Sequence, residues 1–116
     1  LIIAGSTHRG EEDGIIDWSL PAQTIINRIR GLQPWPTAFT RLHDKTLQIF
    51  RAEIPEARSV PAGCPPGTII DITRSIHVAT GDGRLCLTDL QLAGKKRMPS
   101  EIFLRGYAIH PGERFS

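Results

Sequence analysis

One stretch of the chain repeats its hydrophobic residues at the spacing of an α-helix. Ile25, Ile26 and Ile29 recur every three to four positions, and Ala22 lies on the same side. Polar residues fill the positions between them. This pattern predicts a helix over residues 17–31 with one apolar side against a core.

Residues at the two ends of this stretch are typical of helix termini. Ser19 is predicted to cap the N-terminus, and Pro21 suits the first turn, where its missing N–H costs nothing. Gly31 is predicted to follow the last turn in the left-handed conformation. Trp18, just before the cap, is expected to pack back on the first turn.

After residue 36 the pattern alternates between apolar and polar residues, as β-strands do. Residues 43–44 and 81–83 are predicted to form tight turns, and residues 55–66, with four prolines, a loop. A short helix is expected over residues 100–106, with Ser100 as its cap. The predicted strands are residues 37–42, 45–53, 68–73, 75–80 and 84–92.

One N-terminal helix, five or six short strands and a short C-terminal helix favour a mainly β fold. Uneven connections suit a small closed or partly open barrel better than a sandwich. The connector at residues 33–36 holds two prolines and is predicted to be extended. Trp18 lies beside a helix end and Trp35 lies in this proline turn. We therefore expect both side chains in the core rather than stacked on the bases of a nucleic acid.

Length limits what the chain does, since 116 residues make one domain. The 40% hydrophobic and 22% charged composition excludes a disordered chain, and no apolar run is long enough to cross a bilayer. We expect residues 1–15 to be a remnant linker or flexible segment and residues 16–116 to form the domain. The chain reads as a piece of a longer protein.

Positive charge is concentrated in two segments, although the net charge is only +2. Residues 1–90 carry nine Lys and Arg against ten Asp and Glu, whereas residues 91–116 carry five against two. A second basic stretch runs from Arg28 to Arg51 with Asp44 as its one acidic residue. Two such segments in a near-neutral chain are the pattern expected of a protein with an anion-binding face on one side. An ordinary surface of solvated charges is the alternative interpretation.

Signatures of catalysis and of metal binding are absent from the sequence. Neither a nucleotide-binding glycine loop nor a nucleophile elbow occurs, and neither Cys64 nor Cys86 has a partner at zinc-ligand spacing. We therefore expect no catalytic residue, cofactor or metal in this chain. Cys86 lies in an alternating run and is predicted to be a half-buried thiol, which favours a reducing cytoplasm.

Four motifs, in order, resemble the C-terminal domain of the methionyl-tRNA formyltransferase family. They are IDWSLPA with NRIRGLQPWP at 16–36, the PGT turn at 66–68, the GDG turn at 81–83, and LQLAGKKRM with FLRG at 90–106. Any one of them is weak, but four at the right spacing are specific. The chain departs from the family at Thr37, where a glycine is usual after Pro-Trp-Pro.

The resemblance implies a small open β-barrel of the oligonucleotide-binding-like type, and it implies that this barrel holds initiator tRNA non-specifically by its backbone. A separate N-terminal domain of the same parent chain would transfer the formyl group from 10-formyltetrahydrofolate, in the cytoplasm and without a membrane or metal. A non-catalytic structural domain of a sugar-nucleotide formyltransferase and a stand-alone binding domain remain alternatives. The candidate tRNA-binding residues are all basic: Arg28, Arg30, Arg41, Lys45, Arg51, Lys95, Lys96, Arg97 and Arg105.

Overall fold

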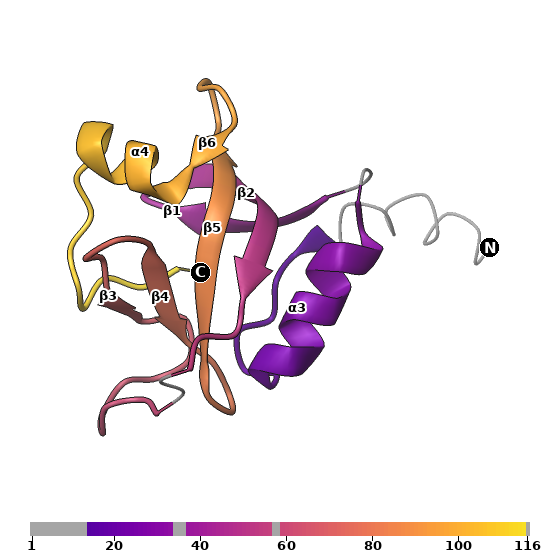
Figure 1. Cartoon of the computed structure of the whole chain (residues 1–116), viewed down its shortest axis with the longest axis vertical. Helices are drawn as coiled ribbons and strands as arrows, with labels where there is room; N and C mark the ends of the chain where they lie inside the picture. The colour runs from indigo at the N-terminus through magenta and orange to yellow at the C-terminus, as the bar shows by residue number, and fades with distance from the viewer. Residues whose placement is uncertain (1–13, 34–36, 57–58, 116) are drawn as a thin grey trace.

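A computed structural model describes residues 14–33, 37–56 and 59–115 of the chain (Figure 1). The helices among these residues are α3 (Ala22–Gly31) and α4 (Ser100–Gly106). Its strands are β1 (Ala38–Leu42), β2 (Lys45–Glu53), β3 (Ile69–Asp71), β4 (Ile76–Ala79), β5 (Arg84–Leu92) and β6 (Met98–Pro99).

The strands form one antiparallel sheet in the order β1-β2-β5-β4-β3. Strand β5 is its centre, with β2 along one edge and β4 followed by β6 along the other. Nine residues of alternating pattern give β5 the length to pair with all three. The sheet curls into a half-barrel, with α3 beside β2 and β5 and α4 crossing one end (Figure 1). This confirms the predicted mainly β open barrel.

The core lies between the concave side of the sheet and α3. Ile25, Ile26 and Ile29 of the helix are each at most 2% exposed. Burying each of these side chains stabilises the fold by about 1.5–3 kcal/mol. Trp18 is also in the core, as expected, where its indole stacks on Phe115 and donates to the Thr40 hydroxyl at 3.0 Å.

Helix α3 begins at Ala22, five residues later than predicted, and Ser19 is not its cap. The Ser19 amide and hydroxyl instead bond to the Asp17 carboxylate, which lowers the pKa of that carboxyl. Pro21 occupies the N-cap position, and the Ala22 amide donates to the carbonyl of Asp82 at 3.1 Å. The β4–β5 turn therefore takes the role that the sequence assigned to Ser19.

The predicted C-terminal cap of α3 is also wrong. Gly31 is the last helical residue and has no positive φ, and Leu32 follows it as the C-cap at φ −93°. The Leu32 amide bonds to the carbonyl of Arg28, which closes the last turn without a left-handed residue.

Helix α4 matches the prediction in length but not in its cap. Pro99 is the N-cap, and Ser100 is a buried residue of the first turn without a capping hydrogen bond. The short strand β6 just before it was not predicted, because two residues are too few to show a period.

Strands β2 and β5 have the predicted bounds, and β1, β3 and β4 are shorter than predicted by one to three residues. The predicted turns at 43–44 and 81–83 are present, and His43 and Asp44 both have positive φ, as a two-residue hairpin requires. Cys86 is a free, buried thiol, and burial raises its pKa.

Some predictions fall on residues outside those described. They are the placement of Trp35 in the core, the extended connector at residues 33–36, of which only Gln33 is described, and the linker at residues 1–15, of which only Gly14 and Ile15 are described. The division into a linker and a domain stays a prediction.

One irregularity interrupts the pairing of β2 with β5. The register is regular up to Ile49 and Leu90, then pairs Arg51 with Asp89, and is regular again from Ala52 and Leu87. Phe50 on β2 and Thr88 on β5 are thus left out of the ladder. Such bulges re-aim side chains, and this pair lies beside the candidate site described next.

Candidate nucleic-acid interface

Four of the predicted basic residues lie at one end of the sheet. Lys95 and Lys96 are exposed in the β5–β6 turn, and Lys45 opens β2 beside it. The Ala93 amide donates to the Thr46 carbonyl at 2.9 Å, which holds the two turns together, and Arg41 is the β1 partner of Thr46. We call Arg41, Lys45, Lys95 and Lys96 the basic tip.

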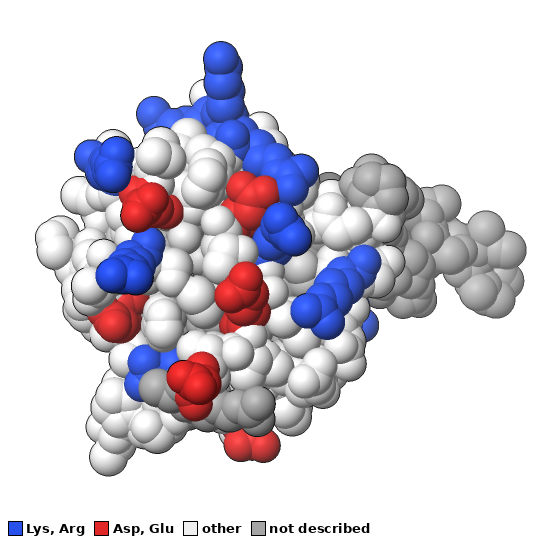
Figure 2. All heavy atoms as spheres, viewed as in Figure 1, with Lys and Arg blue, Asp and Glu red and all other residues white. Residues whose placement is uncertain are grey.

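The basic tip is the most positive end of the face in Figure 2. Lys and Arg side chains crowd the end of the molecule where the β5–β6 turn lies in Figure 1, and Asp and Glu begin below it. Exposed ammonium groups at a turn attract phosphates over a distance that salt shortens.

Arg97 is adjacent to these lysines in sequence but is held differently. Its Nε and Nη2 bond to the Asp89 carboxylate at 2.7 and 2.6 Å. Its guanidinium carbon lies 4.2 Å from the centre of the Phe50 ring, a cation–π contact. Arg97 is therefore fixed on the outer side of the sheet and part of its charge is compensated.

Arg30 and Arg51 line one groove between the end of α3 and the irregular part of β2. Its volume is about 320 Å³, and Phe50 and Thr88, the two residues left out of the ladder, also line it. The Gln33 side-chain amide donates to the Phe50 carbonyl at 3.0 Å and ties the helix end to the bulge. Arg97 stacks on Phe50 but does not itself line this groove.

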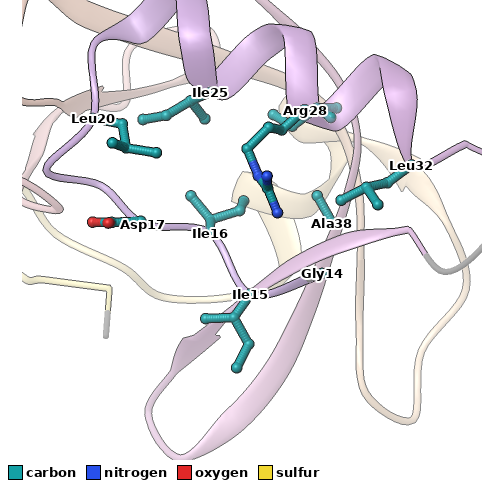
Figure 3. A pocket seen from close by; sticks show the side chains of 10 residues that line it. Gly14, Ile15, Ile16, Asp17, Leu20, Ile25, Arg28, Leu32 and Ala38 are labelled. Atoms are coloured by element: carbon teal, nitrogen blue, oxygen red, sulfur yellow. The ribbon is translucent and has the colours of Figure 1, made fainter. Parts of the chain in front are cut away.

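Two candidates lie apart from these groups. Arg28 is on the other side of α3, where it extends over the segment at residues 14–17 and helps to line a small apolar pocket (Figure 3). Arg105 is exposed on the last turn of α4. Residues two positions apart on an α-helix do not share a side, so α3 separates Arg28 from Arg30.

A hydrogen-bonded cluster supports the turn that carries Lys45. The His43 imidazole bonds to the Tyr107 hydroxyl at 3.0 Å and, through Nε2, to the Glu113 carboxylate. The bond from His43 lowers the pKa of Glu113, and the His110 amide adds to the effect. This cluster joins the β1–β2 turn to the C-terminal segment.

Other titratable groups lie on the β3–β4 half of the sheet, away from the basic tip. Burial lowers the pKa of His77, and the nearby Arg84 guanidinium, 3.3 Å away, lowers it further. Hydrogen bonds from Thr73 lower the pKa of Asp71. Within the described ranges, no group of three or more His, Cys, Asp or Glu side chains is placed to hold a metal ion.

The sequence did not point to Gln33, Phe50 or Thr88. Their places in the groove depend on a bulge and on a long-range hydrogen bond, and neither leaves a periodic signal. The one available hint was an aromatic residue at a polar position of an alternating strand.

Residues 10–108 match the family model described as the formyl transferase C-terminal domain. The chain belongs to this family. The match spans α3, the whole sheet, the basic tip and α4, so the basic tip and the groove both lie within the formyltransferase C-terminal domain.

Curated relatives of this formyltransferase domain are named methionyl-tRNA formyltransferase. The protein from Citrifermentans bemidjiense is 46% identical over 103 residues, covering 88% of this chain and 31% of the relative. The protein from Staphylococcus aureus is 44% identical over 97 residues, covering 82% of this chain and 30% of the relative. The chain thus spans about a third of the length of these relatives.

Among solved structures, the domain resembles part of HypX from Aquifex aeolicus, crystallised in complex with tetrahydrofolic acid. The TM-score is 0.61 at 19% identity, covering 77% of this chain and 16% of HypX. At that identity the likeness supports the fold. In the described part of the formyltransferase domain, neither helix is long and apolar enough to cross a membrane.

Proposed function

We propose that this domain holds tRNA for an enzyme that formylates the amino group of initiator methionyl-tRNA. The observation that carries the proposal is the meeting of Lys45, Lys95 and Lys96 at one end of the domain, in a chain whose relatives are named for this reaction. These side chains contact phosphates and 2′-hydroxyls, which position an RNA without reading its bases.

The formyl transfer itself belongs to a catalytic domain of the same parent protein. That domain moves the formyl group from 10-formyltetrahydrofolate to the methionyl amine, while the basic tip anchors the body of the tRNA. The residues described here supply binding and orientation, and the reaction takes place in the cytoplasm, where charged tRNA is used.

The test is direct binding of the chain to an initiator tRNA transcript at about 50 mM salt, where phosphate contacts are strongest. We expect a saturable shift by fluorescence anisotropy, and we expect an elongator tRNA to compete equally, because backbone contacts carry no sequence information.

Absence of binding at this salt concentration would contradict the proposal. It would favour a structural domain, such as one that braces a sugar-nucleotide formyltransferase, or a stand-alone module with another partner. Strong preference for one tRNA would contradict the backbone mode of binding in particular.

A further inference from the structure

We infer that the groove between α3 and β2 binds a single unstacked nucleotide of an RNA. The inference rests on the proposed RNA-binding function and adds a site to it. The groove contains three kinds of group that a nucleotide needs: guanidinium groups for phosphate, an aromatic side chain for the base, and polar side chains at its edge.

The two arginines of the groove come from different elements. Arg30 is in the last turn of α3 and Arg51 is in the bulged part of β2, and both are exposed. Arginine matches phosphate oxygens with paired N–H groups, so two of them on one groove suit a phosphodiester.

Phe50 is the half-buried aromatic residue of the groove. On the outer side of the strand, the Arg97 guanidinium covers part of its ring. A base that stacks on Phe50 is the second flat group in contact with the ring, after the Arg97 guanidinium. Single-strand-binding proteins stack bases on aromatic side chains in the same way.

The position of Phe50 is fixed before any ligand binds. The Gln33 amide holds the Phe50 carbonyl, and the Asp89 carboxylate holds Arg97 against the ring. A pre-ordered site loses little side-chain entropy on binding, which favours affinity. The irregular pairing of β2 with β5 therefore serves ligand binding as well as the curvature of the sheet.

The size of the groove and its remaining polar residues limit the kind of ligand that fits it. About 320 Å³ is at the lower end of the roughly 300–1,000 Å³ of small-ligand pockets, which suits one nucleotide and not a duplex. Glu53 on the wall repels a phosphate there, so the phosphates face the arginines and the base faces Glu53 and Thr88.

The experiment compares two RNAs with the whole chain: a single-stranded decamer containing 2-aminopurine, and the same strand in a duplex. We expect 2-aminopurine fluorescence to fall on binding of the single strand, because the fluorophore is quenched when it stacks. The variant Phe50→Leu keeps an apolar side chain but removes the ring. It should weaken single-strand binding about tenfold, within the roughly 1–3 kcal/mol per stacked base, and should leave duplex binding unchanged.

Two further variants separate this inference from the proposed function. Arg51→Gln should weaken single-strand binding more than duplex binding, and it keeps the inference testable if Phe50→Leu unfolds. The pair Lys95→Ala and Lys96→Ala should weaken both RNAs alike and leave the degree of quenching at saturation unchanged.

Three results would overturn the inference. Unaltered single-strand affinity and quenching in Phe50→Leu would exclude the groove while duplex binding still supported the basic tip. Equal losses for both RNAs in Arg51→Gln would make that arginine an ordinary backbone contact. If neither RNA bound the wild-type chain, the proposed function would fail together with the groove.

Discussion

Lys95, Lys96 and Arg97 look alike in the sequence, but the structure gives them different surroundings. The two lysines are exposed in a turn, whereas Arg97 bonds to Asp89 and covers Phe50. The sequence predicted their positive charge correctly, but it contained no sign of these long-range partners. The distinction matters because a mutation at each position tests a different property.

Replacing Arg97 with alanine should lower the free energy of unfolding by roughly 0.5–1 kcal/mol, the combined scale of an exposed ion pair and a cation–π contact. Lys96→Ala should leave stability unchanged. Urea unfolding of both variants checks this, and equal stability of the two would show that the Arg97 contacts contribute nothing.

Thr37 is the residue at which the chain departs from its family, and its backbone is strained. It has φ 74° and is 4% exposed, although a β-branched residue rarely adopts positive φ. The glycine that is usual at this position adopts positive φ readily, and the structure keeps the positive φ with threonine in place.

Thr37→Gly should therefore raise the free energy of unfolding by about 0.5–1 kcal/mol, since relief of strain outweighs the extra chain entropy of glycine. Thr37→Ala should give less, because alanine retains a Cβ. Thermal unfolding measures both, and a lower midpoint for the glycine variant would show that the buried threonine side chain matters more than its backbone.

Elements that depend on a repeating pattern were predicted well, and those that depend on contacts between distant residues were not. The alternation of β2 and β5 gave both strands their bounds, and isoleucine spacing gave the buried side of α3. The start of α3 was missed because the carbonyl of Asp82, sixty residues away, binds the Ala22 amide. The groove was missed for the same reason, as it requires the Phe50 bulge.

The contact of the β4–β5 turn with the start of α3 gives a test at this scale. The Gly81 amide donates to the Leu20 carbonyl, and a Cβ on Gly81 would lie 1.8 Å from the Ser19 carbonyl oxygen. Gly81→Ala should destabilise the fold by more than about 2 kcal/mol, because backbone must move.

Gly106→Ala is the matched control, because nothing lies within 4 Å of a Cβ there. Chemical denaturation of both variants measures the difference. A Gly81→Ala variant as stable as wild type would mean that the turn and the helix start separate at little cost.

At the scale of the whole molecule, the C-terminal segment closes the fold by bonding to the first hairpin. Glu113 accepts bonds from His43 and from the His110 amide, and its pKa is lowered chiefly by His43. A carboxyl with a lowered pKa stabilises the fold at pH above the usual glutamate value of 4.5. That contribution is lost as the pH falls through the lowered pKa.

Glu113→Gln should therefore be less stable than wild type near pH 6. The gap should close as the pH falls below 4.5 and through the lowered pKa of Glu113, because both side chains are then neutral. Glu101→Gln, an exposed change on α4, should follow the wild-type profile. Urea midpoints measured across this range decide the matter, and a constant gap between Glu113→Gln and wild type would contradict the linkage.

The same view of the whole molecule explains how a chain of net charge +2 presents the basic surface that we propose holds tRNA. The fold brings Lys45 beside Lys95 and Lys96, while Arg97 is offset by Asp89 and Arg28 lies behind α3. Charge segments in the sequence predicted the residue types of this surface. Which of these basic residues lie together depends on which turns the sheet brings close to each other. The pairing of β2 with β5 determines this, and the sequence does not show that pairing.

The central claim is that the basic tip neutralises the phosphates of the tRNA, and the salt dependence of tRNA binding tests it most directly. The log–log slope of affinity against salt should fall by roughly 1.4–1.8 in the double variant Lys95→Ala, Lys96→Ala, because each phosphate that a lysine neutralises adds about 0.7–0.9 to the slope. Arg74→Ala, an exposed change between β3 and β4, should leave the slope as in wild type. An unchanged slope in the double variant, or an equal fall in Arg74→Ala, would contradict the account.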